Sequence, residues 1–396
     1  MKKYLVCAIF FLLMVIFWYF LPVNIENQKD GLIIKEVYEQ LEKRFLKMPN
    51  HYTVKGCNDF EKYVAENFDK SIIPNSTTLF RVDFDSHRKK FSVKKITPSY
   101  EGIDDRLGPF KSFLKKLKFK SDYDFCFFVD LGDVSHTQSE IGKKIHKIPY
   151  VCADRLLIES NLEDAILIPD YFLIKPNYEL TIKAIKRNLK KKKYLSRLDV
   201  AGWRGAQSVY WHHPAGYYFN LSKIGKFPRL DLVLFSAANP DYVDAKFTSY
   251  DQLLSPGEEG QKYKEFMLKT VGFPSPFVPF EEMVKYQYNI SIDGCVSAWA
   301  RTPWILFTKS VLLYHSLFET FYTPFLKPYV HYVPIKSDMS DLKEKIDELR
   351  ANPELYKKIV ENGAQFAEEI LSPQTIKDYW LKVLTAISKR FCPMPS

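Results

Sequence analysis

One stretch in the second half of the chain, residues 285–342, constrains the fold more than any other. It contains KYQYNISIDG, then SAWAR, the apolar run WILFTKSVLLYH, and the aromatic, proline-containing FYTPFLKPYVHYVPIKSDMSDL. This order predicts a strand, a glycine turn, an arginine-bearing loop, a buried segment, a proline turn, a strand and a helix start. Such a succession is typical of an α/β nucleotide-binding unit, with a guanidinium placed where a diphosphate would bind.

The chain is long enough for two hydrophobic cores. It has 396 residues, and single cores stop growing at about 250–300 residues. We expect an α/β protein of two lobes that enclose a cleft, with an N-terminal lobe over residues 25–195, a C-terminal lobe over 196–371, and a C-terminal helix and tail over 372–396. The formal net charge of +10 favours anionic partners such as phosphates, nucleotide sugars, acidic lipids or nucleic acid.

The N-terminus begins Met-Lys-Lys and continues with eighteen uncharged residues, 4–21. Eighteen is the lower end for a membrane-spanning helix. A cleaved signal peptide is the alternative, but it needs a shorter apolar region and small residues at the cleavage point. The exit FWYFLP is aromatic, which favours an uncleaved single-pass anchor over residues 1–24. The few flanking charges only weakly favour a body outside the cytosol.

Hydrophobic periodicity and turn residues predict the other elements. A buried strand over 125–131 runs into the loop GDVSH, and a basic helix over 178–195 links the two halves. The remaining expected elements are an amphipathic helix from about residue 34, a strand over 79–84 with a hairpin return, a helix over 107–119, a strand over 230–235, a short helix over 280–286, and helices over 342–351, over 353–370 and after Ser372.

The six cysteines are scattered, and none forms a CxxC pair. Neither a zinc site nor a disulfide framework is therefore indicated, although one or two disulfides remain possible. The chain also has no P-loop, HExxH or GxSxG motif, which removes support for P-loop, zincin and α/β-hydrolase chemistry.

Three arginines lie where a diphosphate could be held. Arg301 follows a strand and a glycine within the loop 295–300, whose small residues let backbone N–H groups approach phosphate oxygens. Arg204 in WRGAQS and Arg229 in FPRLDLVLF have similar settings. The alternative for each is a surface arginine beside a turn.

Asp133 follows the buried strand 125–131 and is a candidate general base. An aspartate titrates near ~3.9 in water, so it would need an apolar wall to raise its basicity. The alternative is a loop aspartate that caps the next helix. His136 and the pair His212-His213 are other candidate bases.

Two further features suggest different functions. Asp83 and Asp85 form a D-x-D after a strand, a pattern that holds a divalent ion in metal-dependent glycosyl transfer, but DSHRK also makes an ordinary hairpin turn. Eight of the fifteen residues over 183–197 are Lys or Arg. That run is either a solvated helix or part of a membrane-tethered, non-catalytic binder of an anionic polymer.

The motifs together resemble glycosyltransferase family 90, which contains protein O-glucosyltransferases, capsule-associated xylosyltransferases and lipopolysaccharide-core enzymes. The similarity covers roughly residues 122–387 and is densest in PFEEMVKYQYNISIDG, SAWAR and FLKPYVHYVPIKSDMSDLKEKI, with WRGAQS and NPDYVDAKFT upstream. It implies a GT-B-like fold of two Rossmann-like lobes. It also implies inverting, metal-independent transfer of a glucose- or xylose-type sugar from a UDP-sugar to an acceptor hydroxyl.

The resemblance also implies residue roles. Asp133 matches the catalytic carboxylate, and Tyr171 matches an aromatic that touches donor or acceptor, with Arg204 as a further possible contact. The implied donor-binding residues are Ala206, Arg229, Cys295, Val296, Ser297, Ala298, Trp299, Ala300 and Arg301. The loop has one extra residue before Arg301, and Gly132 stands where protein O-glucosyltransferases carry Arg. The acceptor stays open between a cell-surface glycan or lipopolysaccharide and a protein serine; no cofactor, metal or nucleic-acid partner is expected.

Overall fold

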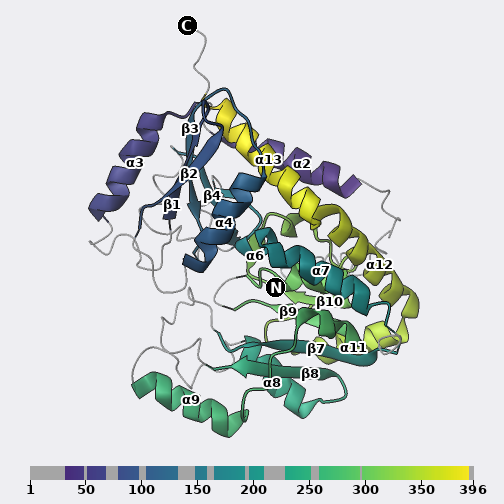
Figure 1. The fold of residues 1–396 in the computed structure, drawn as a ribbon. Coiled ribbons are helices and arrows are strands. Elements are labelled where there is room, and N and C mark those ends of the chain that lie inside the picture. Colours follow the sequence, from purple (N-terminus) through teal and green to yellow (C-terminus); the bar gives the residue numbers. More distant parts are fainter. Residues whose placement is uncertain are drawn as a thin grey trace, which may run out of the picture.

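The structure is a computed structural model. It contains helices together with two five-stranded sheets and one two-stranded sheet (Figure 1). This arrangement confirms the α/β class. The residues that it describes are 32–48, 51–67, 79–97, 104–132, 148–157, 165–191, 196–208, 228–250, 258–294 and 297–391.

The first sheet has the strand order β2-β1-β3-β4-β6. β1, β2 and β3 pair antiparallel, which confirms the hairpin, whereas β3, β4 and β6 pair parallel. All six residues of β3 are buried, as expected of a central apolar strand covered on both faces. The strands are β1 (Leu79–Asp85), β2 (Lys90–Lys95), β3 (Phe125–Asp130), β4 (Tyr150–Cys152) and β6 (Ile166–Leu167).

The first half of the chain also contains helices, of which α3 and α4 contact strands of this sheet. The predicted amphipathic helix is α2, and its apolar positions Val37, Leu41 and Phe45 are buried. The predicted basic helix is α7, whose buried face includes Ile182 and Ile185. The bounds are α2 (Leu32–Lys47), α3 (Val54–Asn67), α4 (Asp104–Lys116), α6 (Tyr171–Ile174) and α7 (Pro176–Asn188).

A disulfide joins Cys57 of α3 to Cys126 of β3. The sequence did not indicate it, because the 69 residues between the two cysteines hide their proximity in space. Cys152 is buried and is not part of a disulfide.

The second sheet has the order β12-β10-β9-β7-β8, and every pair in it is parallel. In chain order this is a doubly wound sheet in which the winding reverses between β7 and β9. Ligands of such sheets bind outside the carboxyl ends of the strands at the reversal. The strands are β7 (Leu198–Ala206), β8 (Val243–Ser249), β9 (Tyr286–Ile292), β10 (Val311–His315) and β12 (Val333–Pro334).

The predicted strand over 230–235 is wrong, because these residues belong to helix α8. Its buried residues include Leu230, Leu232, Val233 and Ser236, and Pro228 is its first residue, a position that proline favours. A short apolar run alone does not distinguish a buried strand from a buried helix. The other elements here are α8 (Pro228–Ala238), α9 (Glu258–Thr270), η6 (Phe280–Lys285), α10 (Arg301–Phe307), α11 (Leu342–Ala351) and α12 (Pro353–Ile370).

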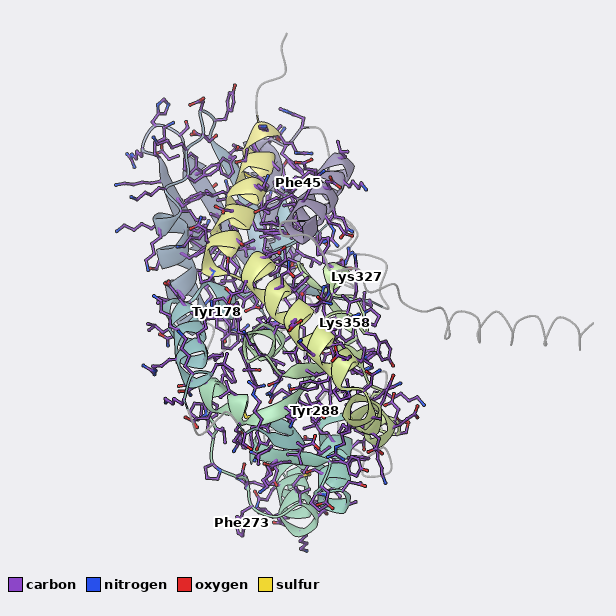
Figure 2. The ribbon with its side chains drawn as sticks, turned by 90° about the vertical axis from the view of Figure 1, so that its right-hand side faces the viewer. Phe45, Tyr178, Phe273, Tyr288, Lys327 and Lys358 are labelled. Carbon is purple, nitrogen blue, oxygen red and sulfur yellow. A yellow bond between two sulfur atoms is a disulfide. The ribbon has the colours of Figure 1, made fainter. Side chains whose placement is uncertain are left out.

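The chain then returns to the first sheet along α13 (Pro373–Lys389), as Figures 1 and 2 show. Ser372 caps this helix through a hydrogen bond from the Thr375 N–H, as predicted. Trp380 packs beside Phe110 and Phe113, with ring centroids 5.8 Å from each. The predicted domain limits remain a prediction.

A two-stranded antiparallel sheet connects the two halves directly. It pairs β5 (Asp154–Leu156) with β11 (Phe318–Thr320). Glu319 in β11 forms ion pairs with Arg155 of β5 and with Arg44 of α2. The short helix η7 (Thr323–Phe325) follows.

The prediction of a single-pass membrane protein needs correction. None of the helices in the described part of the chain combines the length and the apolar character needed to cross a bilayer. Residues 4–21, on which the prediction rested, lie outside the described residues. We therefore withdraw the membrane anchor and the localisation drawn from it.

Candidate donor site at the reversal of the second sheet

Two of the predicted arginines meet at the reversal of the second sheet. Arg229 is the second residue of α8 and Arg301 is the first residue of α10, and both helices begin near the carboxyl ends of β7 and β9. The two guanidinium carbons lie 5.8 and 5.2 Å from the centre of the Trp203 ring, which is fully buried in β7. Trp203 therefore supports both groups through cation–π contacts.

Arg229 joins the ends of the two strands. Its Nη1 donates to the carbonyl of Ala206 at 2.9 Å and to Oγ of Ser208 at 2.6 Å. Its Nε donates to the carbonyl of Asp293 at 3.0 Å. Burial raises the pKa of the Asp293 carboxyl to about 7. Arg229 is thus held in one orientation by the backbone of β7 and by the residue that follows β9.

Arg301 lies against the Trp203 ring without a carboxylate partner among the described residues. Burial, and then the nearby charge of Arg229, lowers the pKa of its guanidinium to about 9. At neutral pH two positive charges therefore face one another in a half-buried site. A bound anion with several oxygen atoms would offset both the burial and the repulsion.

Glycines bring the backbone close to both guanidinium groups. A Cβ atom on Gly205 would lie 2.9 Å from Nη2 of Arg301, and one on Gly294 would lie 2.5 Å from Nη2 of Arg229. A methyl group at either position would therefore force the neighbouring side chains to shift.

Arg204 is not part of this cluster. Its Nη2 binds both carboxylate oxygens of Asp244, at 2.9 and 2.8 Å, and its Nη1 donates to the Asp244 carbonyl. Successive side chains of a strand point to opposite faces, so Arg204 projects away from the face that carries Trp203. Its charge is therefore neutralised within the sheet.

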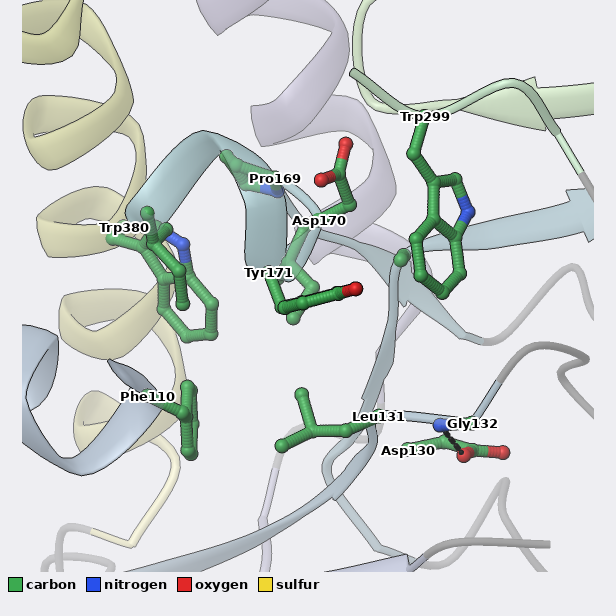
Figure 3. A pocket seen from close by; sticks show the side chains of 12 residues that line it. Phe110, Asp130, Leu131, Gly132, Pro169, Asp170, Tyr171, Trp299 and Trp380 are labelled. Atoms are coloured by element: carbon green, nitrogen blue, oxygen red, sulfur yellow. Dashed lines mark hydrogen bonds between the residues drawn. The ribbon is translucent and has the colours of Figure 1, made fainter. Parts of the chain in front are cut away.

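The predicted base cannot be placed with the arginines. Asp133 lies outside the described residues, as do Cys295, Val296, His136 and the pair His212-His213. The described chain reaches Gly132, whose N–H donates to Oδ1 of the buried Asp130 at 2.8 Å (Figure 3). The role of Asp133 stays a prediction.

A small cavity lies at this end of β3. Figure 3 shows Tyr171 and Trp299 on one side of it and Leu131 and Gly132 on another. Tyr171 and Trp299 meet edge to face, with ring centroids 5.3 Å apart. The structure thus brings together one predicted residue from each half of the chain. The lining residues are Phe110, Asp130, Leu131, Gly132, Ala153, Ile168, Pro169, Asp170, Tyr171, Ile174, Trp299 and Trp380.

Four residues of this region were missed in the sequence. Asp130 and Asp154 each belong to a strand of the first half, and both are 2% exposed. Asp170 caps α6, and burial raises the pKa of its carboxyl to about 7. The Arg106 guanidinium lies 4.8 Å from the Tyr171 ring centre and 5.0 Å from that of Trp299. The three aspartates each follow an apolar run, a signal that the sequence offers as it does for Asp133.

The alternative D-x-D pair has other partners. Arg81 binds Asp83, and Asp85 accepts a hydrogen bond from the backbone N–H of Arg88 at 2.8 Å within the hairpin turn. In the described ranges no group of three or more His, Cys, Asp or Glu residues is arranged to hold a metal ion.

Comparison with known proteins resolves the family. Residues 160–395, more than half of the chain, match the family model described as glycosyl transferase family 90. The chain belongs to glycosyl transferase family 90. The family predicted from the sequence is therefore confirmed, and the matched range includes Tyr171, Arg229 and Arg301 but begins after Asp133.

Curated relatives of this family 90 chain include protein O-glucosyltransferases. Protein O-glucosyltransferase 3 of Mus musculus is 28% identical over 274 residues, and that of Homo sapiens is 30% identical over the same length. Each alignment covers 69% of this chain and 48% of the relative. Protein O-glucosyltransferase 1 of Rattus norvegicus is 34% identical over 161 residues, covering 40% of this chain and 38% of the relative. The chain thus spans about half the length, or less, of these relatives.

Proposed function

We propose that this chain is an inverting, metal-independent glycosyltransferase that moves a glucose- or xylose-type sugar from a UDP-sugar to an acceptor hydroxyl. The two five-stranded sheets would form the lobes of a GT-B-like fold. The first sheet departs from a parallel Rossmann sheet through its antiparallel strands β1 and β2.

The pairing of Arg229 and Arg301 over Trp203 carries this proposal. Both lie at the reversal of a parallel doubly wound sheet, beside glycines that leave the backbone accessible. The diphosphate of a UDP-sugar would bind there, and the two guanidinium groups would stabilise charge that builds on the departing UDP. Stabilisation of developing charge is usually the largest contribution to catalysis.

Asp133 would act as the general base. The acceptor oxygen attacks the anomeric carbon, the bond from that carbon to the β-phosphate oxygen breaks, and the acceptor proton passes to the Asp133 carboxylate. An apolar environment would raise the basicity of this carboxylate.

A protein hydroxyl is the acceptor best supported by the comparisons. The curated relatives described above are protein O-glucosyltransferases, so we favour glucosyl transfer to a protein side chain over transfer to a glycan. UDP-sugar and acceptor would be the partners, and neither a metal nor another cofactor would be needed.

The test is a UDP-release assay with several UDP-sugars and peptide or glycan acceptors, in the presence and absence of a chelator. The proposal expects turnover that survives chelation and is lost in Asp133→Asn. Loss of turnover on chelation and in Asp83→Ala, with Asp133→Asn active, would instead support the metal-dependent alternative. Binding of anionic polymer without UDP release from any donor would support the non-catalytic alternative.

A further inference from the structure

A buried carboxylate of the first half of the chain holds the loop that leads to Arg301. Asp154 lies in β5 and is 2% exposed. Its Oδ2 accepts a hydrogen bond from Oγ of Ser297 at 2.6 Å and another from Nε1 of Trp299 at 2.7 Å. Hydrogen bonds to a charged acceptor are shorter and stronger than those between neutral groups.

The same loop is also fastened to the end of β3. The Trp299 ring contacts both the Arg106 guanidinium and the Tyr171 ring. Nη1 of Arg106 donates to the carbonyl of Leu131 at 2.5 Å, two residues before Asp133. Trp299 therefore has its N–H fixed by β5 and its ring fixed beside the end of β3.

The position of Arg301 depends on this loop. The backbone N–H of Arg301 donates to the carbonyl of Ala298 at 2.8 Å, which closes a tight turn over residues 298–301. Asp154 binds the residue before that turn and a residue within it. A shift of Ser297 or Trp299 would therefore move the point from which Arg301 reaches the Trp203 ring.

We propose that Asp154 is a positioning residue that fixes the loop 297–301 against the first sheet and so sets the place of Arg301 relative to the end of β3. This inference rests on the proposed function. Asp154 touches neither the diphosphate nor the reacting atoms. It acts through Ser297 and Trp299. Through them it holds both the loop that leads to Arg301 and the Trp299 ring that lies beside the end of β3.

Three variants test the inference. Asp154→Asn removes the charge, Ser297→Ala removes one donor, and Trp299→Phe removes the N–H and keeps an aromatic ring beside Tyr171 and Arg106. Each should weaken UDP binding about tenfold, the usual effect of losing a hydrogen bond to a charged group. The double variant Asp154→Asn/Trp299→Phe should be no weaker than about the worse single one, because both changes remove the same interaction.

The matched control is Arg155→Gln, next to Asp154 in the same strand. It removes the ion pair with Glu319 and keeps the carboxylate of Asp154 that accepts the hydrogen bonds of Ser297 and Trp299. It should lower the melting temperature and leave UDP affinity unchanged. If Asp154→Asn behaves like this control, the inference is overturned. If Asp154→Asn fails to fold, Ser297→Ala and Trp299→Phe are compared with the control instead. Unchanged UDP affinity in both variants then overturns the inference.

Hydrogen exchange of the unliganded protein separates this inference from the proposed function. Amides of residues 297–301 should exchange faster in Asp154→Asn than in the wild type, while those of β10 should be unchanged. Unchanged exchange in the loop overturns the inference whatever the protein binds. If residues 297–301 exchange faster in Asp154→Asn but the wild type binds no UDP, the function proposed for the site is contradicted. The role of Asp154 in positioning Arg301 for a donor is then contradicted as well.

Discussion

Arg229 lies so close to Gly294 that no side chain fits between them. A Cβ atom on Gly294 would be 2.5 Å from Nη2 of Arg229 and 2.4 Å from Oγ of Ser208. Gly294 does not have a positive φ, so an alanine could adopt its backbone conformation. The restriction at this position therefore comes from the arginine and not from the backbone.

Gly294→Ala should consequently displace Arg229 and weaken UDP binding by about tenfold or more, since a charged hydrogen-bonding group is lost from the site. Gly108→Ala is the control, because a Cβ there meets nothing within 4 Å. The measurement is UDP affinity by titration calorimetry. Equal affinities for the two variants would show that the contact of Arg229 with Gly294 has no part in nucleotide binding.

The disulfide between Cys57 and Cys126 should contribute to stability. It closes a segment with a sequence separation of 69, for which chain-entropy arguments give up to about 4 kcal/mol. The variant Cys57→Ala/Cys126→Ala should melt at a lower temperature than the wild type, and a reductant should lower the melting temperature of the wild type alone. A wild type that is insensitive to reductant, and that shows two more free thiols by titration than the double variant, would contradict the assignment.

The pH dependence of stability should contain a contribution from Asp170. Its pKa is raised to about 7 by burial, above the ordinary value of 3.8. The folded state therefore holds this proton more tightly than the unfolded state, and the free energy of unfolding falls as the pH rises from about 4 to about 7. Each pKa unit of difference corresponds to about 1.4 kcal/mol.

Asp170→Asn removes this proton and keeps an oxygen that can cap α6 through the Phe172 N–H. The variant should lose less stability than the wild type between pH 4.5 and pH 7.5 in denaturant titrations. Parallel pH profiles for the two proteins would contradict a raised pKa at this position.

The sequence predicted some elements well because their ends carry strong local signals. The helices over 342–351 and 353–370 have the predicted bounds, and the last helix begins after Ser372 with Pro373 at its first position. By contrast, the run over 230–235 has no alternation of polar and apolar residues that would separate a strand from a buried helix, and tertiary packing decides its state.

The candidate site was only partly predictable. In the sequence Arg204, Arg229 and Arg301 all looked like possible phosphate ligands. The partner of Arg204 is Asp244 on the neighbouring strand β8, and that pairing depends on sheet register, which the sequence did not give. Asp154 was missed for a similar reason, since its donors Ser297 and Trp299 come from a loop more than 140 residues away.

The most direct test of the central claim compares Arg301 with Arg204. UDP affinity and the free energy of unfolding are measured for the wild type, Arg301→Gln and Arg204→Gln. Arg301→Gln should weaken UDP binding at least about tenfold with little loss of stability, because it removes a charge that faces Arg229. Arg204→Gln should lower stability by leaving the Asp244 carboxylate without its cationic partner, and UDP affinity should stay near that of the wild type. Unchanged UDP affinity in Arg301→Gln, or no measurable affinity in the wild type, would contradict a nucleotide diphosphate site at the reversal of the second sheet.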